Sequence, residues 1–371
     1  MRKVKLGELL RIKHGFAFKS ENYVEKSPFA LVTLGNISGS NNFQFNPEKT
    51  TYYGASFPEE FKLKTDDLIM PLTEQVVGLF GNSAFIPEMP GIQFVLNQRV
   101  GKVIPYEDKA DKYYLHYLLS TELVREQLEY RASGTQQRNI SPTDVYDVTV
   151  FVPEIETQKK IGRLLYSIEL KINSNSRIND NLQQQMFTIY ETMMVGAEKK
   201  KIPGRNITAK EITEVITGKE DANFSTSGGE YKFFTCSTTP LKCDEAAFDS
   251  ASILIAGNGD FNVKHYTGKF NAYQRTYVLT PPDKYYAILY LASLYRINSF
   301  KSASAGSIVK FITKGDVENI PLFIPDNELY LQQLNSLVRL QEQMSTENEK
   351  LISLRDWLLP MLMNGQATIS D

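Results

Sequence analysis

Two long stretches of the chain place apolar residues at alternating spacings of three and four, the repeat of helices that pair along one face. The first stretch follows Pro153, and its seam is Ile161, Leu165, Ile168, Ile172, Asn175, Asn179, Leu182, Met186, Ile189 and Met193. The second follows Pro325, and its seam is Leu337, Leu340, Met344, Glu347, Leu351, Leu354, Leu358 and Met361. Each seam becomes polar near its middle, and no Gly or Pro interrupts Lys171–Met194 or Asp326–Leu359.

These stretches predict two helices of about 35–40 residues, far beyond the globular mean of about 11–12. That length favours a coiled coil, and two ordinary amphipathic helices lying on globular domains are the alternative. The first helix leads from one domain to the next, and the second starts at the second domain. If the seams pack on each other, the pair is therefore antiparallel, and about 38 residues give a rod of roughly 55–60 Å.

The segments that precede the two helices match each other in order, which predicts a duplicated unit. The last two matches share an offset of 172 residues, and the earlier ones shift as loops of different length require. The matching pairs are Leu6–Gly15 with Lys210–Lys219, Asn97–Arg99 with Tyr273–Arg275, Asp111–Tyr114 with Asp283–Tyr286, and Gly134–Pro153 with Gly306–Pro325.

The expected fold class is therefore mixed α/β, with two tandem α/β domains that are each followed by a long helix. Inside the domains we expect short strands at Val148–Val152 and Ser252–Ala256 and a helix from Asp111 to about Tyr130. The expected boundaries are 1–153 for the first domain, 154–197 for the first helix, 198–205 for a linker, 206–325 for the second domain and 326–371 for the second helix.

The composition, 42% hydrophobic and 23% charged, is that of a folded globular protein. The longest apolar run, Tyr285–Tyr295, is about half of a membrane span. The N-terminus lacks the apolar core of a signal peptide, so a cytoplasmic protein is expected. Cys236 and Cys243 fit two plain thiols, and three histidines are too few and scattered for a metal site or a catalytic triad.

The net charge of −2 is unevenly spread. Phe261–Lys314 holds eight Lys or Arg against one acid, whereas Gly315–Asp371 holds nine acids against three bases. Met1–Ala30 holds seven bases against three acids. A basic patch on a nearly neutral protein is typical of a face that contacts phosphates, with a solvated surface as the alternative.

Polar loops at equivalent places in the two repeats are the candidates for such contacts. Gln and Asn can bind adenine through two hydrogen bonds, and Arg can bind guanine in the same way. For each residue a loop hydrogen bond or an ordinary surface position is the alternative. The candidate DNA-binding residues are Gln98, Arg99, Gln136, Gln137, Arg138, Asn258, Lys264, His265, Gln274, Arg275, Ser307 and Lys310.

Motifs for catalysis are missing from the sequence. We find no P-loop, no G-x-G-x-x-G, no H-E-x-x-H and no G-x-S-x-G. An Asn-Pro-Pro-aromatic segment of the adenine-methyltransferase type and an acid-acid-Lys nuclease cluster are absent as well. The sequence therefore predicts a protein without catalysis, a cofactor or a metal of its own.

Three segments resemble the specificity subunit of type I restriction-modification systems: Leu6–Ser20, Gly134–Ile168 and Leu351–Gln366. The similarity in architecture covers essentially the whole chain. It implies two target-recognition domains that bind double-stranded DNA, each reading half of an asymmetric bipartite site. It also implies that the antiparallel helices fix the spacer and hold two modification (adenine methyltransferase) subunits, which restriction subunits join.

The base-contacting residues of that family vary too much to be transferred, so the candidates above rest on side-chain chemistry alone. Two other hypotheses stay open. One is a non-catalytic protein-interaction scaffold whose paired domains bind protein ligands. The other is a methyltransferase with degenerate motifs, which would bind S-adenosylmethionine.

Overall fold

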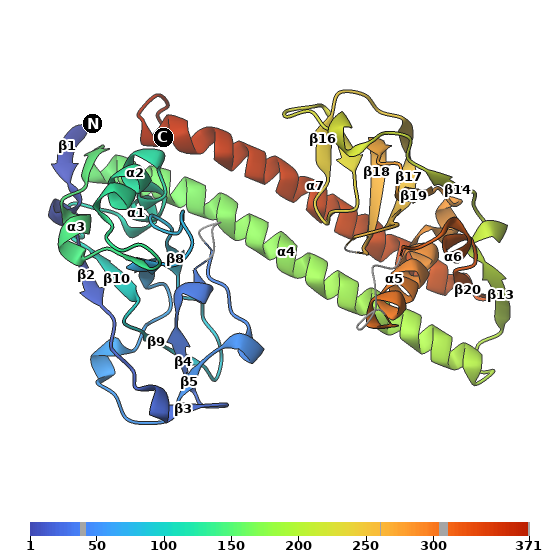
Figure 1. Cartoon of the computed structure of the whole chain (residues 1–371), viewed down its shortest axis with the longest axis horizontal. Coiled ribbons are helices and arrows are strands. Elements are labelled where there is room, and N and C mark those ends of the chain that lie inside the picture. Colours follow the sequence, from blue (N-terminus) through green and yellow to red (C-terminus); the bar gives the residue numbers. More distant parts are fainter. Residues whose placement is uncertain (38–41, 260, 304–310, 370–371) are drawn as a thin grey trace. The chain divides into compact units, whose positions relative to one another are not determined.

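The computed structural model describes residues 1–37, 42–259, 261–303 and 311–369 and divides into two compact units (Figure 1). Unit 1 comprises Met1–Lys171 and Leu351–Asp371, and unit 2 comprises Ile172–Lys350. The two long helices are α4 (Ile155–Glu198) and α7 (Leu329–Met363), and each of them contributes a segment to both units. In the described part of the chain, no helix combines the length and apolarity that a membrane span needs.

The first domain is built from two four-stranded sheets and two short strand pairs. One sheet has the order β2 (Leu10–His14), β10 (Val100–Pro105), β6 (Leu68–Pro71), β8 (Ala84–Phe85). The other has the order β3 (Tyr23–Val24), β5 (Tyr52–Tyr53), β4 (Phe29–Val32), β9 (Gln93–Leu96). The short pairs are β1 (Arg2–Lys5) with β12 (Thr149–Val152) and β7 (Thr73–Glu74) with β11 (Arg138–Asn139). The helices are α1 (Lys112–Leu119), α2 (Glu122–Arg131) and α3 (Pro142–Tyr146).

The second domain carries one six-stranded sheet and one strand pair. The sheet order is β14 (Val215–Thr217), β19 (Thr276–Leu279), β17 (Phe248–Ala256), β18 (Val263–Ala272), β15 (Tyr231–Phe234), β16 (Leu241–Cys243). The pair is β13 (Gly204–Thr208) with β20 (Pro321–Pro325), and the helices are α5 (Tyr286–Ala303) and α6 (Lys314–Glu318).

Most strand pairings of the first domain have a counterpart in the second, as the sequence duplication predicts. β2–β10–β6 in the first domain corresponds to β14–β19–β17 in the second, and the parallel pair β4–β9 corresponds to β15–β18. The long strand β18 corresponds to two strands of the first domain. It pairs with β17 as β8 pairs with β6, and it pairs with β15 as β9 pairs with β4.

Both domains require a glycine directly after an equivalent strand, Gly15 after β2 and Gly218 after β14. A Cβ atom on Gly15 would lie 2.0 Å from the Asn97 carbonyl oxygen, and one on Gly218 would lie 2.1 Å from the Ala272 carbonyl oxygen. The backbone of this strand end therefore passes directly against the chain that leads out of β9 or β18, and no larger residue fits there.

Each domain core is completed by both long helices. In unit 2, Met186 and Met193 of α4 lie in one buried cluster with Leu334 and Val338 of α7 and the apolar residues of the second domain. In unit 1, Ile161 and Leu165 of α4 share the core of the first domain with Leu362 and Met363 of α7. The helices are therefore part of the domain interiors.

Polar contacts fix the register of the helix pair within unit 2. Asn175 Nδ2 of α4 donates to Glu347 Oε2 of α7 at 2.8 Å, and Gln341 Nε2 of α7 donates to Gln183 Oε1 of α4 at 3.1 Å. Residue numbers rise along α4 as they fall along α7, so the pair is antiparallel, as predicted. The Asn348 amide also donates to the main chain of α4, at 3.1 Å. Polar residues in a helix seam select one register over its neighbours.

Two sequence predictions about helices were wrong in detail. The helix expected from Asp111 to about Tyr130 is two helices, because the hydroxyls of Ser120 and Thr121 donate to carbonyls of α1 and end it. The predicted second seam misplaced Leu340 and Leu354, which are 39% and 43% exposed. Since α7 packs on the domains as well as on α4, its buried face does not follow a single heptad line.

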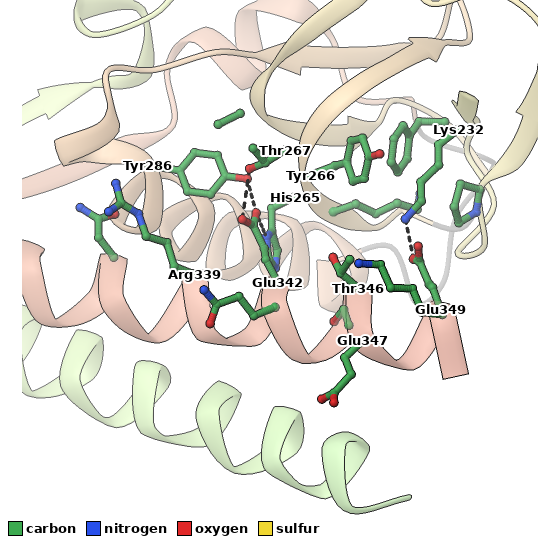
Figure 2. A pocket seen from close by; sticks show the side chains of 18 of the residues that line it. Lys232, His265, Tyr266, Thr267, Tyr286, Arg339, Glu342, Thr346, Glu347 and Glu349 are labelled. Carbon is green, nitrogen blue, oxygen red and sulfur yellow. Dashed lines mark hydrogen bonds and ion pairs between the residues drawn. The ribbon is translucent and has the colours of Figure 1, made fainter. Parts of the chain in front are cut away.

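A groove of about 860 Å³ runs between the sheet of the second domain and α7 (Figure 2). At its floor, Glu342 Oε1 lies 2.9 Å from His265 Nδ1 of β18 and accepts a hydrogen bond of 2.9 Å from the Tyr286 hydroxyl. At its end, Lys232 Nζ pairs with Glu349 Oε1 at 2.5 Å. These polar and charged groups bind each other across the groove and attach the second domain to α7.

The Glu342 carboxylate has a lowered pKa. Burial opposes its ionisation, but hydrogen bonds from His265, Tyr286 and Thr267 outweigh the burial and hold the pKa below the ordinary value of 4.5. A group whose pKa is lower in the folded state stabilises that state above its unfolded pKa. This contribution is lost as the pH falls through the folded-state value.

We therefore expect Glu342→Gln to lower the free energy of unfolding by about 1–3 kcal/mol at pH 7, since it leaves buried partners without their charged acceptor. The difference from the wild type should shrink as the pH falls below about 4.5. Urea unfolding from pH 7 down to pH 3.5 measures both effects. The matched control is Glu349→Gln, which removes a half-exposed ion pair worth less than about 1 kcal/mol. Equal costs for the two variants would contradict the anchoring role of Glu342.

Candidate nucleic-acid interface

Three segments of the first domain meet at the residue that follows strand β6. The Leu72 amide donates to the Arg99 carbonyl at 2.9 Å, and the Ile140 amide donates to the Leu72 carbonyl at 3.0 Å. The Gln98–Arg99 turn between β9 and β10 and the loop 133–139 therefore lie on either side of the segment 72–75. Candidate residues that are far apart in the sequence come together here.

The second domain repeats this arrangement with the same hydrogen bonds. The Gly257 amide donates to the Arg275 carbonyl at 2.8 Å, and the Ile312 amide donates to the Gly257 carbonyl at 2.9 Å. Gly257 follows β17 as Leu72 follows β6, and the Gln274–Arg275 turn follows β18. The two candidate sites therefore share one backbone framework.

The Gln98–Arg99 turn exposes both side chains at the edge of a polar hollow of about 370 Å³. Hydroxyl and amide side chains dominate its walls, and they include Thr33, Gln75 and Asn97. Thr33 and Gln75 were not predicted from the sequence. The framework identifies them only after folding, because Thr33 follows β4 and Gln75 follows β7, far from the turn in sequence.

The loop 133–139 holds the remaining first-domain candidates. Gln136 is exposed, and the Gln137 side chain donates to Asn139 Oδ1 at 3.2 Å. Gly134 has φ of +111°, and a Cβ atom there would lie 2.1 Å from the Gln137 carbonyl oxygen. This glycine therefore allows the tight turn that presents the two glutamines.

Arg138 has internal partners. Its guanidinium pairs with Glu74 Oε1 at 2.8 Å and donates to the Glu129 carbonyl at 2.6 Å. It also lies 5.8 Å from the centre of the Phe80 ring. Glu74 was not predicted from the sequence, because the loop around Arg138 contains no acid and the carboxylate comes from a strand 64 residues earlier.

In the second domain, Asn258 and the main chain of Arg275, in the exposed Gln274–Arg275 turn, come together around the thiol of Cys236. Asn258 Oδ1 accepts a hydrogen bond from Cys236 Sγ at 2.7 Å, and the same sulfur lies 3.7 Å from the Arg275 carbonyl oxygen. The Lys264 ammonium group donates to the Thr235 carbonyl at 3.3 Å. Ser307 and Lys310 lie outside the described residues.

His265 lies apart from the other second-domain candidates. Its side chain is 12% exposed, and both ring nitrogens lie within hydrogen-bond distance of α7 side chains, Glu342 and Gln341. Figure 2 shows it pointing from β18 to the helix. A contact between this ring and DNA would require it to leave these partners.

One buried cluster in unit 1 has the residue types of a hydrolase triad. Ser83 Oγ lies 2.8 Å from His116 Nδ1, and His116 Nε2 lies 3.5 Å from Glu169 Oε2. Ser83 and His116 are fully buried and Glu169 is 6% exposed, so a substrate cannot reach the serine. The Tyr117 hydroxyl also donates to Glu169 at 2.7 Å. The cluster attaches α1 to α4. Within the described ranges, no group of three His, Cys, Asp or Glu side chains is placed to hold a metal ion.

Known proteins share both the sequence pattern and the fold. The family model of the type I restriction modification DNA specificity domain matches residues 1–184 and 199–353. The EcoDI type I restriction enzyme specificity subunit of Escherichia coli is 34% identical over 181 residues, which are 47% of this chain and 41% of that protein. The MjaVIII specificity subunit of Methanocaldococcus jannaschii is 26% identical over 202 residues, 53% of this chain and 46% of that protein.

The matches therefore span less than half the length of these two relatives. Among solved structures, the S subunit of a type I restriction-modification system from M. genitalium superimposes with a TM-score of 0.68 at 16% identity. That comparison covers 100% of this chain and 96% of the other, and it shows a shared fold. Since the family model matches both halves, the chain belongs to the type I restriction modification DNA specificity family.

Proposed function

We propose that the chain is a non-catalytic subunit that reads double-stranded DNA for a type I restriction-modification complex. Each domain reads one half of an asymmetric bipartite site. The observation that carries this proposal is the repeated framework, in which Leu72 and Gly257 hold an exposed Gln-Arg turn in the same way in both domains. Two equivalent sites with different side chains suit two half-sites of different sequence.

The exposed turns are the strongest candidates for DNA contact. Arg99 and Arg275 can reach phosphates or guanine, and Gln98 and Gln274 can bind base edges. Gln136 and Gln137 add amides in the first domain, where the second domain has Ile308 and Val309 in the same alignment. Asn258, Lys264, Ser307 and Lys310 remain further candidates for the second half-site.

The long helices are the proposed attachment for two modification subunits, which restriction subunits would join. Both helices expose apolar side chains, including Leu170 of α4 at 49% and Trp357 of α7 at 59%. Exposed apolar residues on a long helix are suited to a protein partner. The same residues would serve a pure protein-interaction scaffold, which differs by showing no salt-dependent binding to DNA. We propose that the domain boundaries predicted from the sequence delimit the DNA-reading parts and that the predicted helix boundaries delimit the parts that hold partner subunits.

A methylome tests the function directly. The chain would be expressed with its methyltransferase partner, and modified adenines would be sequenced genome-wide. A bipartite methylated motif that appears only in the presence of this chain is expected. A stable complex that adds no motif would contradict the proposal if titration across salt also shows no DNA binding.

Arg99→Ala and Arg275→Ala should weaken binding to the methylated motif. The slope of log affinity against log salt should flatten by about one unit for each phosphate that a variant no longer neutralises. Gel-shift titrations across roughly 50 to 200 mM salt measure the slope. The control variants are Arg2→Ala and Arg205→Ala, exposed arginines of the equivalent strands β1 and β13. Unchanged slopes and unchanged affinities for both turn variants would remove these turns from the interface.

The helices are proposed to set the spacer between the half-sites. Adding seven residues to both α4 and α7 in the polar layer keeps the seams paired and lengthens each helix by about 10 Å. The methylated motif should then gain about three unspecified base pairs, at roughly 3.4 Å per base pair. Insertion into α4 alone should abolish assembly or the motif, because it breaks the register. An unchanged spacer in the double insertion would show that the helices do not measure it.

A further inference from the structure

We propose that Glu74 is a positioning residue that clamps two DNA-reading loops of the first domain through Arg138. One loop is residues 75–79, and the other is the loop 133–139 described above. The inference rests on the proposed function. It assigns Arg138 to the clamp, so that its guanidinium binds Glu74 and does not contact a DNA phosphate.

Glu74 is built into the protein interior. It is 1% exposed, and its Oε2 atom accepts hydrogen bonds from the main-chain amides of Leu79 at 3.0 Å and Phe80 at 3.2 Å. The same carboxylate thus closes the loop 75–79 on itself. A buried carboxylate is stable only when hydrogen bonds and a cation compensate its charge. Arg138 supplies the cation on Oε1.

Arg138 connects this carboxylate to the second loop. It lies directly opposite Glu74 in the β7–β11 pair, and the neighbouring pair in that ladder, Thr73 and Asn139, adds a side-chain hydrogen bond of 2.9 Å. The guanidinium also binds the Glu129 carbonyl at the end of α2. Its charge is therefore largely neutralised inside the domain, which leaves little of it for a phosphate.

The clamped loops expose different chemistry to a ligand. Val76 and Val77 are 78% and 69% exposed at the tip of one loop, and Gln136 is exposed on the other. Apolar side chains and amides are the groups that read base edges, thymine methyls included. Since a hydrogen bond depends steeply on distance and angle, a clamp that holds both loops determines how well the first half-site is read.

The two domains differ in sequence at the position of the clamping carboxylate. The shared framework aligns Leu72 with Gly257, which places Gly259 where the first domain has Glu74. A change at Glu74 is therefore expected to affect one half-site and leave the other unchanged. A drop in overall stability would weaken both.

The test uses the full chain and a DNA duplex that contains the sequence motif identified by the methylome. Glu74→Gln and Arg138→Gln should each lower affinity about tenfold, because loops released from the clamp misplace their reading groups and hydrogen bonds weaken steeply with distance and angle. The salt slope should stay unchanged, and substitutions in the first half-site should become tolerated. The double variant should bind no worse than either single variant, because both remove the same clamp. Arg138→Lys should recover part of the affinity.

The half-site read by the first domain is defined as the one whose discrimination changes in Gln98→Ala. The matched control is Asp67→Asn, which breaks a half-buried ion pair with Lys102 in the same domain, at 2.6 Å, outside the two loops. It should leave discrimination at both half-sites intact. If Glu74→Gln fails to fold, the Arg138 variants provide the same readouts.

A salt slope that flattens by about one unit in Arg138→Gln, with wild-type binding in Glu74→Gln, would overturn the clamp and make Arg138 a phosphate contact. Equally weakened discrimination at both half-sites would also overturn it. If the wild-type chain itself shows no DNA binding, the proposed function fails, and that result differs from a failure of the clamp alone.

Discussion

The pairing of α4 with α7 is the interaction on which the rest of the structure depends, because neither domain has a complete core without both helices. Leu334 and Val338 of α7 fill the second domain together with Met186 of α4, and Leu362 fills the first domain together with Leu165. The apolar contacts supply stability, but a heptad repeat of apolar residues does not by itself select one register. The amide and carboxylate layer around Asn175 does, since a shift would leave polar groups buried without partners. The polar centre of the seam therefore determines which segments of α4 and α7 are available to complete the core of each domain.

The duplication separates what must stay constant from what is free to change. The constant part is main-chain geometry: a glycine at the end of the first sheet strand, an amide donated to the carbonyl of the Arg in the Gln-Arg turn, and an amide from the third segment. None of these contacts involves a side chain, so the sequences of the loops can diverge while the framework is kept. Glu74 against Gly259 and the glutamines against Ile308 and Val309 are such divergences. A fold of this kind suits a protein whose two sites read different sequences.

Periodicity and internal repeats predicted the features that depend on local spacing. The first seam was correct: Ile161, Leu165 and Met186 are buried, and Asn175 lies in the polar layer. The second seam failed at Leu340 and Leu354, because α7 contacts a domain and a helix on different faces, and one heptad line cannot represent both. Of the candidate site, the sequence located the two Gln-Arg turns and the glutamine loop. It could not locate Glu74, because a contact between residues 64 positions apart leaves no periodic trace.

Charge counts along the sequence overstate how many cations are available to a ligand. Arg138 is neutralised by Glu74, Lys232 by Glu349, and the His265 ring faces Glu342. Each of these bases lies in contact with an acid from a distant segment. Arg99 and Arg275 differ because their side chains are exposed, while neighbouring segments hold the main-chain carbonyls of their turns. Pairing with an acid from a distant segment therefore distinguishes a cation that organises the protein from one that can meet a phosphate, and this pairing depends on tertiary structure.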